Sequence, residues 1–230
     1  MKTKCQRNNT ETSDMYSGWF ELYEAGSEGV PAWSEAPPPF LEDLKPFLRP
    51  GTVTLETCCG DGRITNTIVG WDAQVTALDL SPVALKQLVA NFKHRGMPPP
   101  LTVVGSAIDI PLGDGQFDAV ICVNGLCQIH RPHLAIQEAA RVLRPGGKYL
   151  FDVFTPRDAT FGSGEQIAAQ DFLFKGCLFR YYFRHQFEPL FRNIFRVAEM
   201  FEAKWSDPAH GTFRPTPHDH HALVYILEKI

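Results

Sequence analysis

A short segment after an apolar run carries the residues best suited to binding a charged ligand. Glu56 ends the run, and Gly60, Asp61 and Gly62 follow before a helical pattern begins at Arg63. Glycine permits backbone angles that a side chain forbids, and it lets a ligand approach the main chain. The N-terminus of the following helix presents free N–H groups. The segment therefore predicts a ligand-binding turn between a strand and a helix.

A second acidic residue, Asp79, ends the next apolar run. Nucleotide-binding folds place the carboxylate that binds both ribose hydroxyls at this distance beyond the glycine turn. Ser81 stands directly before the helical pattern from Pro82 and already supplies a helix cap, so capping does not explain Asp79. Asp79 is therefore predicted to bind a ribose.

The chemistry of the turn favours a cationic ligand over a dinucleotide. The dinucleotide fingerprint G-x-G-x-x-G needs a third glycine, but Thr65 occupies that position. Glu56 would also repel a pyrophosphate group. A ligand that carries an ammonium and a sulfonium suits this carboxylate, which leaves a nicotinamide oxidoreductase as a distant alternative.

Alternating strands and helices must position these residues. Strands are predicted at 53–57, 74–80, 101–105, 117–123 and 148–154, with helices at 63–69, 82–94 and 135–143. This alternation indicates parallel strands joined by right-handed crossovers. Segments 200–205 and 222–229 are expected to form an antiparallel pair of strands at the end of the sheet.

The remaining segments are read from their periodicity and turn residues. Helices are predicted at 15–25, 40–48 and 188–197, an extended strand at 172–183, and a loop rich in proline and histidine at 206–221. Residues 1–45 are expected to form a cap or lid, and residues 46–230 the main domain.

Composition excludes several classes of function. The chain has 230 residues, 44% of them hydrophobic, and a net charge of −4, so no excess of positive charge favours nucleic acid or a membrane surface. Its polar beginning lacks the apolar core of a signal peptide, and no stretch reaches the length of a membrane span. The six cysteines lack the C-x-x-C spacing of a zinc site. We expect a cytoplasmic protein.

The chain resembles the class I S-adenosylmethionine-dependent methyltransferases over roughly residues 50–155. Four motifs carry this resemblance in order: the acidic–glycine turn at 56–62, Asp79-Leu80-Ser81, the segment 105–118, and Arg141-Val142-Leu143-Arg144-Pro145-Gly146-Gly147. The resemblance implies an α/β, Rossmann-like fold with a seven-stranded, mostly parallel sheet and a terminal antiparallel hairpin.

The resemblance also implies S-adenosylmethionine as the cofactor. Glu56 would hold the methionine amino group, directly or through water. Gly60 and Gly62 would lie under the methionine and the ribose. Asp79 would bind the ribose hydroxyls, with Leu80 against the adenine.

The other implied contacts lie at the two ends of the cofactor. Ser106 and Ala107 would face the adenine edge, while Asn124 and Gly125 would line the methionine end near the transferred methyl group. Two residues depart from the family pattern, because Cys58 replaces the first glycine of the turn and Ser106 replaces an aspartate. These departures keep open the alternative of a methyltransferase-like domain without catalysis that acts through a partner.

The N-terminal aromatic segment is similar to the start of thiopurine-type and halide- or tellurite-type methyltransferases. In those families the segment closes over the cofactor, which would place Tyr16 and Trp19 beside it. Packing of the segment against the edge of the sheet is an equal alternative.

The substrate side of the site is predicted from residue chemistry alone. A small-molecule acceptor is expected, and histidines are the candidate bases because they titrate near neutral pH. His130, His185 and His218 are the candidates singled out. No metal site is expected, because adjacent histidines on an extended segment point to opposite sides.

Overall fold

The structure is a computed structural model that describes residues 9–25, 36–210 and 213–230, with side chains of the first helix described from Ser17 onward. The side chain of Tyr16 and most of the proline-rich segment 31–39 therefore lie outside the described residues. Among the described helices, none has the length and apolar character needed to cross a membrane.

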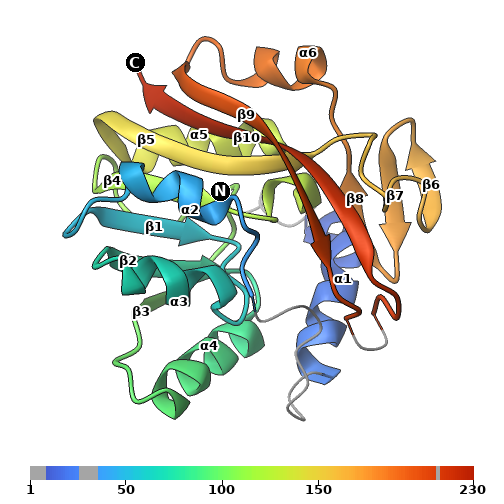
Figure 1. The fold of residues 1–230 in the computed structure, drawn as a ribbon, viewed down its shortest axis with the longest axis horizontal. Helices are drawn as coiled ribbons and strands as arrows, with labels where there is room; N and C mark the ends of the chain where they lie inside the picture. The colour runs from blue at the N-terminus through green and yellow to red at the C-terminus, as the bar shows by residue number, and fades with distance from the viewer. Residues whose placement is uncertain (1–8, 26–35, 211–212) are drawn as a thin grey trace, which may run out of the picture.

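A seven-stranded sheet forms the centre of the molecule, in the order β3-β2-β1-β4-β5-β10-β9 (Figure 1). Its strands are β1 (Val53–Thr57), β2 (Gln74–Asp79), β3 (Leu101–Val104), β4 (Phe117–Cys122), β5 (Leu143–Phe154), β9 (Phe195–Asp207) and β10 (His218–Lys229). The first five are parallel, whereas β10 runs antiparallel to both β5 and β9. The predicted mostly parallel sheet with a terminal antiparallel hairpin is confirmed.

Helices cover both faces of this sheet. Helix α3 (Arg63–Gly70) packs with α2 (Leu41–Leu44) on one face, and α4 (Pro82–His94) packs against Ala77 on the same side. Helix α5 (Pro132–Val142) packs on the opposite face, where its Ile136 and Ala139 join the largest buried cluster. Figure 1 shows this layered arrangement, with α3 and α5 on opposite sides of the strands.

Local sequence explains where the helices next to the site begin. Helix α4 has Pro82 in its first turn, and the Ser81 hydroxyl accepts a hydrogen bond from the Ala84 amide at 3.2 Å. Helix α3 starts after Gly62, whose φ of 93° suits glycine because it has no Cβ. These caps fix the two turns that follow β1 and β2.

The last third of the chain differs from the sequence prediction. Segment 172–183 is not one strand, because Lys175 and Gly176 both have positive φ and form a turn between two strands. A separate antiparallel sheet results, made of β6 (Glu165–Ala168), β7 (Asp171–Phe174) and β8 (Cys177–Arg180).

The helix predicted at 188–197 is also wrong. The chain forms one helical turn, α6 (Arg184–Phe187), followed by a 3-10 turn at Glu188–Leu190, and it enters β9 at Phe195. Phe187, Phe191 and Phe195 are buried, so their spacing reflects packing under the sheet rather than one continuous helix. The loop predicted at 206–221 is shorter, because β10 begins at His218.

Helix α1 (Asn9–Ala25) lies beside β8, away from the edge strand β3 (Figure 1). The Gly18 amide donates to the Gly176 carbonyl at 3.3 Å, and Gln87 of α4 donates to the Tyr23 carbonyl at 2.7 Å. The helix therefore connects the small sheet with the main sheet. The division at residue 45 into a cap and a main domain stays a prediction.

Candidate active site

A cavity of about 210 Å³ opens at the carboxyl ends of the parallel strands. Its wall is formed by the turns after β1, β2, β3 and β4 together with α1, β8 and the β9–β10 hairpin. Ligand sites in open α/β sheets lie at this end of the strands. Because the wall combines distant parts of the chain, the cavity depends on the complete fold.

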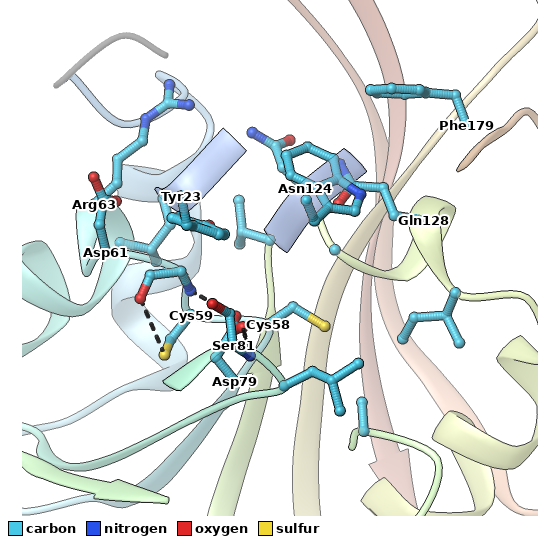
Figure 2. A pocket seen from close by; sticks show the side chains of 18 of the residues that line it. Tyr23, Cys58, Cys59, Asp61, Arg63, Asp79, Ser81, Asn124, Gln128 and Phe179 are labelled. Atoms are coloured by element: carbon cyan, nitrogen blue, oxygen red, sulfur yellow. Dashed lines mark hydrogen bonds between the residues drawn. The ribbon is translucent and has the colours of Figure 1, made fainter. Parts of the chain in front are cut away.

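Asp79 joins the turns after β1 and β2. Its carboxylate accepts hydrogen bonds from the Gly60 amide at 2.9 Å and from the Ser81 amide at 2.8 Å. Burial raises the pKa of Asp79, and these amide donors partly oppose that shift. Figure 2 shows the carboxylate beside Cys58 and Cys59, below Tyr23. Each carboxylate oxygen retains a lone pair, so Asp79 can still accept bonds from a ligand.

Gly60 cannot be replaced without disturbance. Its φ is +57°, and an added Cβ would lie 2.3 Å from the Tyr23 hydroxyl oxygen. Tyr23 is buried and lines the cavity, so α1 supplies an aromatic ring directly over the glycine turn. The glycine is thus required both by the backbone and by the packing of α1.

Cys58 and Asn124 adopt the left-handed region, with φ of 57° and 54°. This left-handed conformation costs about 1 kcal/mol or more in a residue with a side chain. Gly125 fits against this arrangement, because an added Cβ would lie 2.7 Å from the Cys58 Cβ and 2.8 Å from the Cys122 sulfur. Cys58 and Gly125 are therefore matched in size, and the loss of the family's first glycine is accommodated by packing.

Glu56 is placed differently from its neighbours. It is paired in register with Ala77 and Ile121, which puts its side chain on the face covered by α3. The side chain is 2% exposed and does not line the cavity, and among the described residues its Oε2 has no hydrogen-bond partner. Burial raises the pKa of Glu56 to about 8. This carboxyl group is protonated at pH 7 unless a cation lies near it.

Arg63 and Asp61 also belong to the wall, although sequence reasoning assigned them no role. Arg63 is largely buried, and its Nη2 lies 3.8 Å from an Asp207 oxygen and has no hydrogen bond among the described residues. Burial lowers the pKa of the guanidinium, which still remains charged. The first residue of α3 thus offers a buried positive charge to the cavity. In Figure 2 both side chains lie on the same side of the cavity as Tyr23.

The segment expected at the adenine is held by α5. Arg141 donates to the carbonyls of Ile110 and Leu112 at 2.8 and 2.9 Å, while Glu138 accepts from the Ile110 amide at 2.8 Å. Arg141 and Glu138 are also paired with each other at 2.7 Å. The Arg-Val-Leu motif therefore fixes the position of the turn that contains Ser106.

The predicted cofactor residues fall into two groups. The cavity wall includes Trp19, Cys58, Gly60, Asp79, Leu80, Ser106, Ala107, Asn124 and Gly125. Glu56 and Gly62 do not line the cavity, and Gly62 instead packs against Leu88, which an added Cβ would meet at 2.8 Å. Gly62 therefore serves the packing of α3 on α4.

The structure brings only one of the three candidate bases to the cavity. His130 and His185 are exposed and do not line it, and the His185 ring stacks on Phe183. His218 lines the cavity, together with His210 and His220. The sequence carries one signal that groups His218 with His220. Side chains alternate between the two sides of a strand, and these histidines are two residues apart, so they share one side of β10.

Aromatic rings form much of the cavity wall. They come from α1, β5, β8 and the loop between β9 and β10: Trp19, Phe20, Phe154, Phe179 and Phe213. Trp19 packs between Phe179 and Phe213, with ring centroids 6.1 and 6.0 Å apart. Figure 2 places Phe179 across the cavity from Asp79, beyond Asn124 and Gln128. This part of the cavity is suited to a compact organic molecule.

Comparison with known proteins agrees with this geometry. Residues 55–151 match the family model described as "Methyltransferase domain". An uncharacterized methyltransferase of Synechocystis sp. is 36% identical over 124 residues, which cover 53% of this chain and 55% of that protein. A demethylmenaquinone methyltransferase of Corynebacterium efficiens is 34% identical over 117 residues, covering 50% of this chain and 48% of that protein.

A solved structure shares the fold over the whole chain. It is the 1,6-didemethyltoxoflavin-N1-methyltransferase of Burkholderia thailandensis, with bound 1,6-didemethyltoxoflavin and S-adenosylhomocysteine. The TM-score is 0.66 at 19% identity, covering 100% of this chain and 93% of that chain. The chain spans about half the length of the curated relatives it matches.

Residues 55–151 are thus similar to a methyltransferase domain, and the sheet order and the glycine turn with Asp79 agree with that similarity. The part of the chain beyond residue 151 supplies β9, β10 and the small sheet, which complete the cavity.

Proposed function

We propose that the protein transfers the methyl group of S-adenosylmethionine to a small organic nucleophile held in this cavity. The observation that carries the proposal is that one cavity joins Asp79 and the glycine turn to the aromatic wall of α1, β8 and the β9–β10 hairpin. Cofactor and acceptor would therefore share an enclosed space, as methyl transfer requires.

The residues at the turns fit such a cofactor. Asp79 would accept bonds from the ribose hydroxyls, and Leu80, Ser106 and Ala107 would surround the adenine. At the methionine end the wall contains two buried polar atoms without a hydrogen bond among the described residues, Arg63 Nη2 and Asn124 Oδ1. A carboxylate and an ammonium would satisfy these two atoms. The bound cofactor supplies an electrophilic methyl group on its sulfonium.

Glu56 would act on the cofactor without contacting the cavity surface. Its buried carboxyl lies on the α3 face at the end of β1, next to the turn that would hold the methionine. A cationic ligand in that turn would favour the ionised carboxylate and lower its raised pKa. We assign Glu56 a charge-compensating role, with a water molecule between it and the ammonium.

The acceptor would lie between the methionine end and the aromatic wall. Trp19, Phe179 and Phe213 offer flat apolar surfaces, and the hairpin adds polar groups at one edge. The Corynebacterium relative is a demethylmenaquinone methyltransferase, and a compact aromatic acceptor would also suit this wall. The protein would orient the nucleophile in line with the methyl group and exclude water.

A turnover assay with a panel of acceptors tests this proposal. The purified chain is incubated with S-adenosylmethionine and with hydroquinones, phenols, thiols, amines or halides, and S-adenosylhomocysteine is measured. We expect turnover with at least one small acceptor, and Phe179→Ala should raise its KM. Activity on RNA or protein substrates alone would contradict the small-molecule assignment.

A further inference from the structure

We propose that Asp207, His210 and His218 form a binding site for one divalent transition metal ion of the zinc type, in the wall of the cavity. One ligand atom of each residue lies within 4.8 Å of the others. All three residues line the cavity, on the β9–β10 side. Nothing in the assignment of cofactor residues uses them.

The hairpin brings these residues together. Asp207 is the last residue of β9 and His218 the first of β10, and the two are directly paired in register. His210 follows three residues after Asp207, and its Nε2 lies 3.5 Å from the Asp207 Oδ2 atom. The rings of His210 and His218 are 5.0 Å apart at 83°. The sequence alone places His218 and His220 close together, but it does not reveal that Asp207 of the neighbouring strand lies beside them.

The hydrogen bonds of the two β10 histidines leave their Nε2 atoms free to bind. His218 Nδ1 lies 3.2 Å from the Thr216 carbonyl oxygen, which can only accept, so Nδ1 carries the proton. His220 Nδ1 is likewise held by the Asp158 carboxylate at 2.9 Å. In metal sites, a histidine ligand donates its other N–H to a carbonyl or carboxylate in this way.

His210 provides an independent sign of a missing ligand. Its side chain is 6% exposed, and its Nδ1 has no hydrogen-bond partner among the described residues. A buried polar atom without a partner costs about 1–3 kcal/mol. An ion bound at the Nδ1 atom of this ring would remove that cost.

The surrounding charges are compatible with a divalent ion. Asp207 directs Oδ1 toward Arg63, at 3.8 Å, and Oδ2 toward the histidines. Arg214 also lines the cavity, but its guanidinium lies over the Phe174 ring at 4.4 Å. Buried Asp158, next to His220, adds a second negative charge. The two carboxylates offset the two guanidinium groups, so the ion would meet no net positive charge from these four side chains.

The donor set selects the kind of ion. Two imidazoles and one carboxylate suit zinc and neighbouring transition metals, whereas magnesium and calcium prefer oxygen ligands alone. Three protein ligands leave a coordination position open, and here it would face the acceptor part of the cavity. His220 Nε2, 3.7 Å from Asp207 Oδ2, would border that position.

Metal titration of the full chain tests the site. The purified protein is treated with a chelator, dialysed, and titrated with Zn²⁺ by calorimetry and with Co²⁺ by visible absorption. We expect one ion per chain and the intense visible bands of low-coordinate Co²⁺. His210→Asn and His218→Gln should each weaken Zn²⁺ binding by more than about 100-fold, beyond the 10–100-fold that outer-shell changes cost.

His185→Ala is the matched control, because His185 is exposed and lies outside the cavity. It should bind Zn²⁺ like the unaltered chain. Thermal unfolding and S-adenosylmethionine binding report whether the variants fold, and they separate failure of the metal site from failure of the proposed function. The proposal would be overturned if the unaltered chain did not bind Zn²⁺ stoichiometrically. It would also be overturned if folded His210→Asn and His218→Gln bound Zn²⁺ as tightly as the unaltered chain.

Discussion

At the scale of single residues, Asp79 has two tasks that are coupled. Its carboxylate fixes the glycine turn through the Gly60 and Ser81 amides, and we propose that it also accepts hydrogen bonds from the ribose of the cofactor. The cofactor would therefore meet a turn that is already formed, which would reduce the cost of ordering the turn on binding.

Removing this carboxylate should weaken cofactor binding. We expect Asp79→Ala to reduce S-adenosylmethionine affinity by about 1.5–3 kcal/mol, or about 10- to 150-fold, as lost charged hydrogen bonds do. Calorimetry measures the change, and Asp43→Ala, at an exposed carboxylate of α2, is the control. Unchanged affinity in folded Asp79→Ala would refute the role of this residue.

The raised pKa of Glu56 predicts how stability and cofactor affinity change with pH. Its folded-state pKa is raised by burial to about 8, so ionisation opposes folding, and stability decreases as pH rises from about 4.5 through 8. A cationic cofactor reverses this effect because it favours the carboxylate. Affinity for S-adenosylmethionine should therefore increase up to about tenfold between pH 7 and pH 9, as the ionised fraction rises.

The comparison that isolates Glu56 is Glu56→Gln, measured over the same pH range. The amide cannot ionise, so both the decline in stability and the part of the affinity change due to Glu56 should disappear. Titration of the cofactor's own amino group remains in the variant and can be subtracted. Identical pH profiles for the two proteins would show that Glu56 does not sense the ligand.

At the scale of elements, the parallel strands and their helices follow closely from the sequence. β1, β2, β4 and helices α3, α4 and α5 lie where apolar runs and caps such as Ser81 predict them. Apolar runs and helix caps were enough to predict these elements, because each strand ends at a residue that also begins a turn.

The last third was harder to predict for a physical reason. Its aromatic residues lie at helical spacing, but Phe187, Phe191 and Phe195 reach one buried cluster from a helical turn, a loop and a strand. Long-range packing rather than local propensity decides such segments. For the same reason, the pairing of Asp207 with His218 could not be read from the sequence, whereas the positions of Asp79 and Gly60 could.

The docking of α1 includes one close backbone contact, at Gly18, that a substitution can break. An added Cβ at Gly18 would lie 2.3 Å from the Lys175 carbonyl oxygen and 2.5 Å from the Gly176 carbonyl carbon. Gly18→Val should therefore displace α1 from the turn between β7 and β8. Since α1 carries Trp19 and Tyr23 to the cavity, we expect kcat/KM to decrease at least about tenfold through loss of water exclusion.

Gly70→Ala is the control for this experiment, because nothing lies within 4 Å of a Cβ added there. It should retain normal turnover. The main sheet should stay folded in both variants, as circular dichroism and the S-adenosylhomocysteine-bound melting temperature would report. If Gly18→Val turned over substrate normally, α1 would be structural packing and not a lid.

At the scale of the whole molecule, the fold joins the proposed cofactor-binding turns and an aromatic wall in one cavity. The matched domain supplies the former, and the chain after residue 151 supplies much of the latter. The same scaffold binds dinucleotides in other proteins, so we propose that the choice of cofactor depends on the buried acid Glu56 and on Thr65 at the third glycine position.

A side-by-side calorimetric titration of the full chain with S-adenosylmethionine, NAD and NADP tests this central claim most directly. We predict one S-adenosylmethionine per chain with micromolar-range affinity, on the order of −8 kcal/mol, and no measurable heat with either dinucleotide. Tight binding of NAD or NADP, or no binding of S-adenosylmethionine by the folded chain, would contradict it.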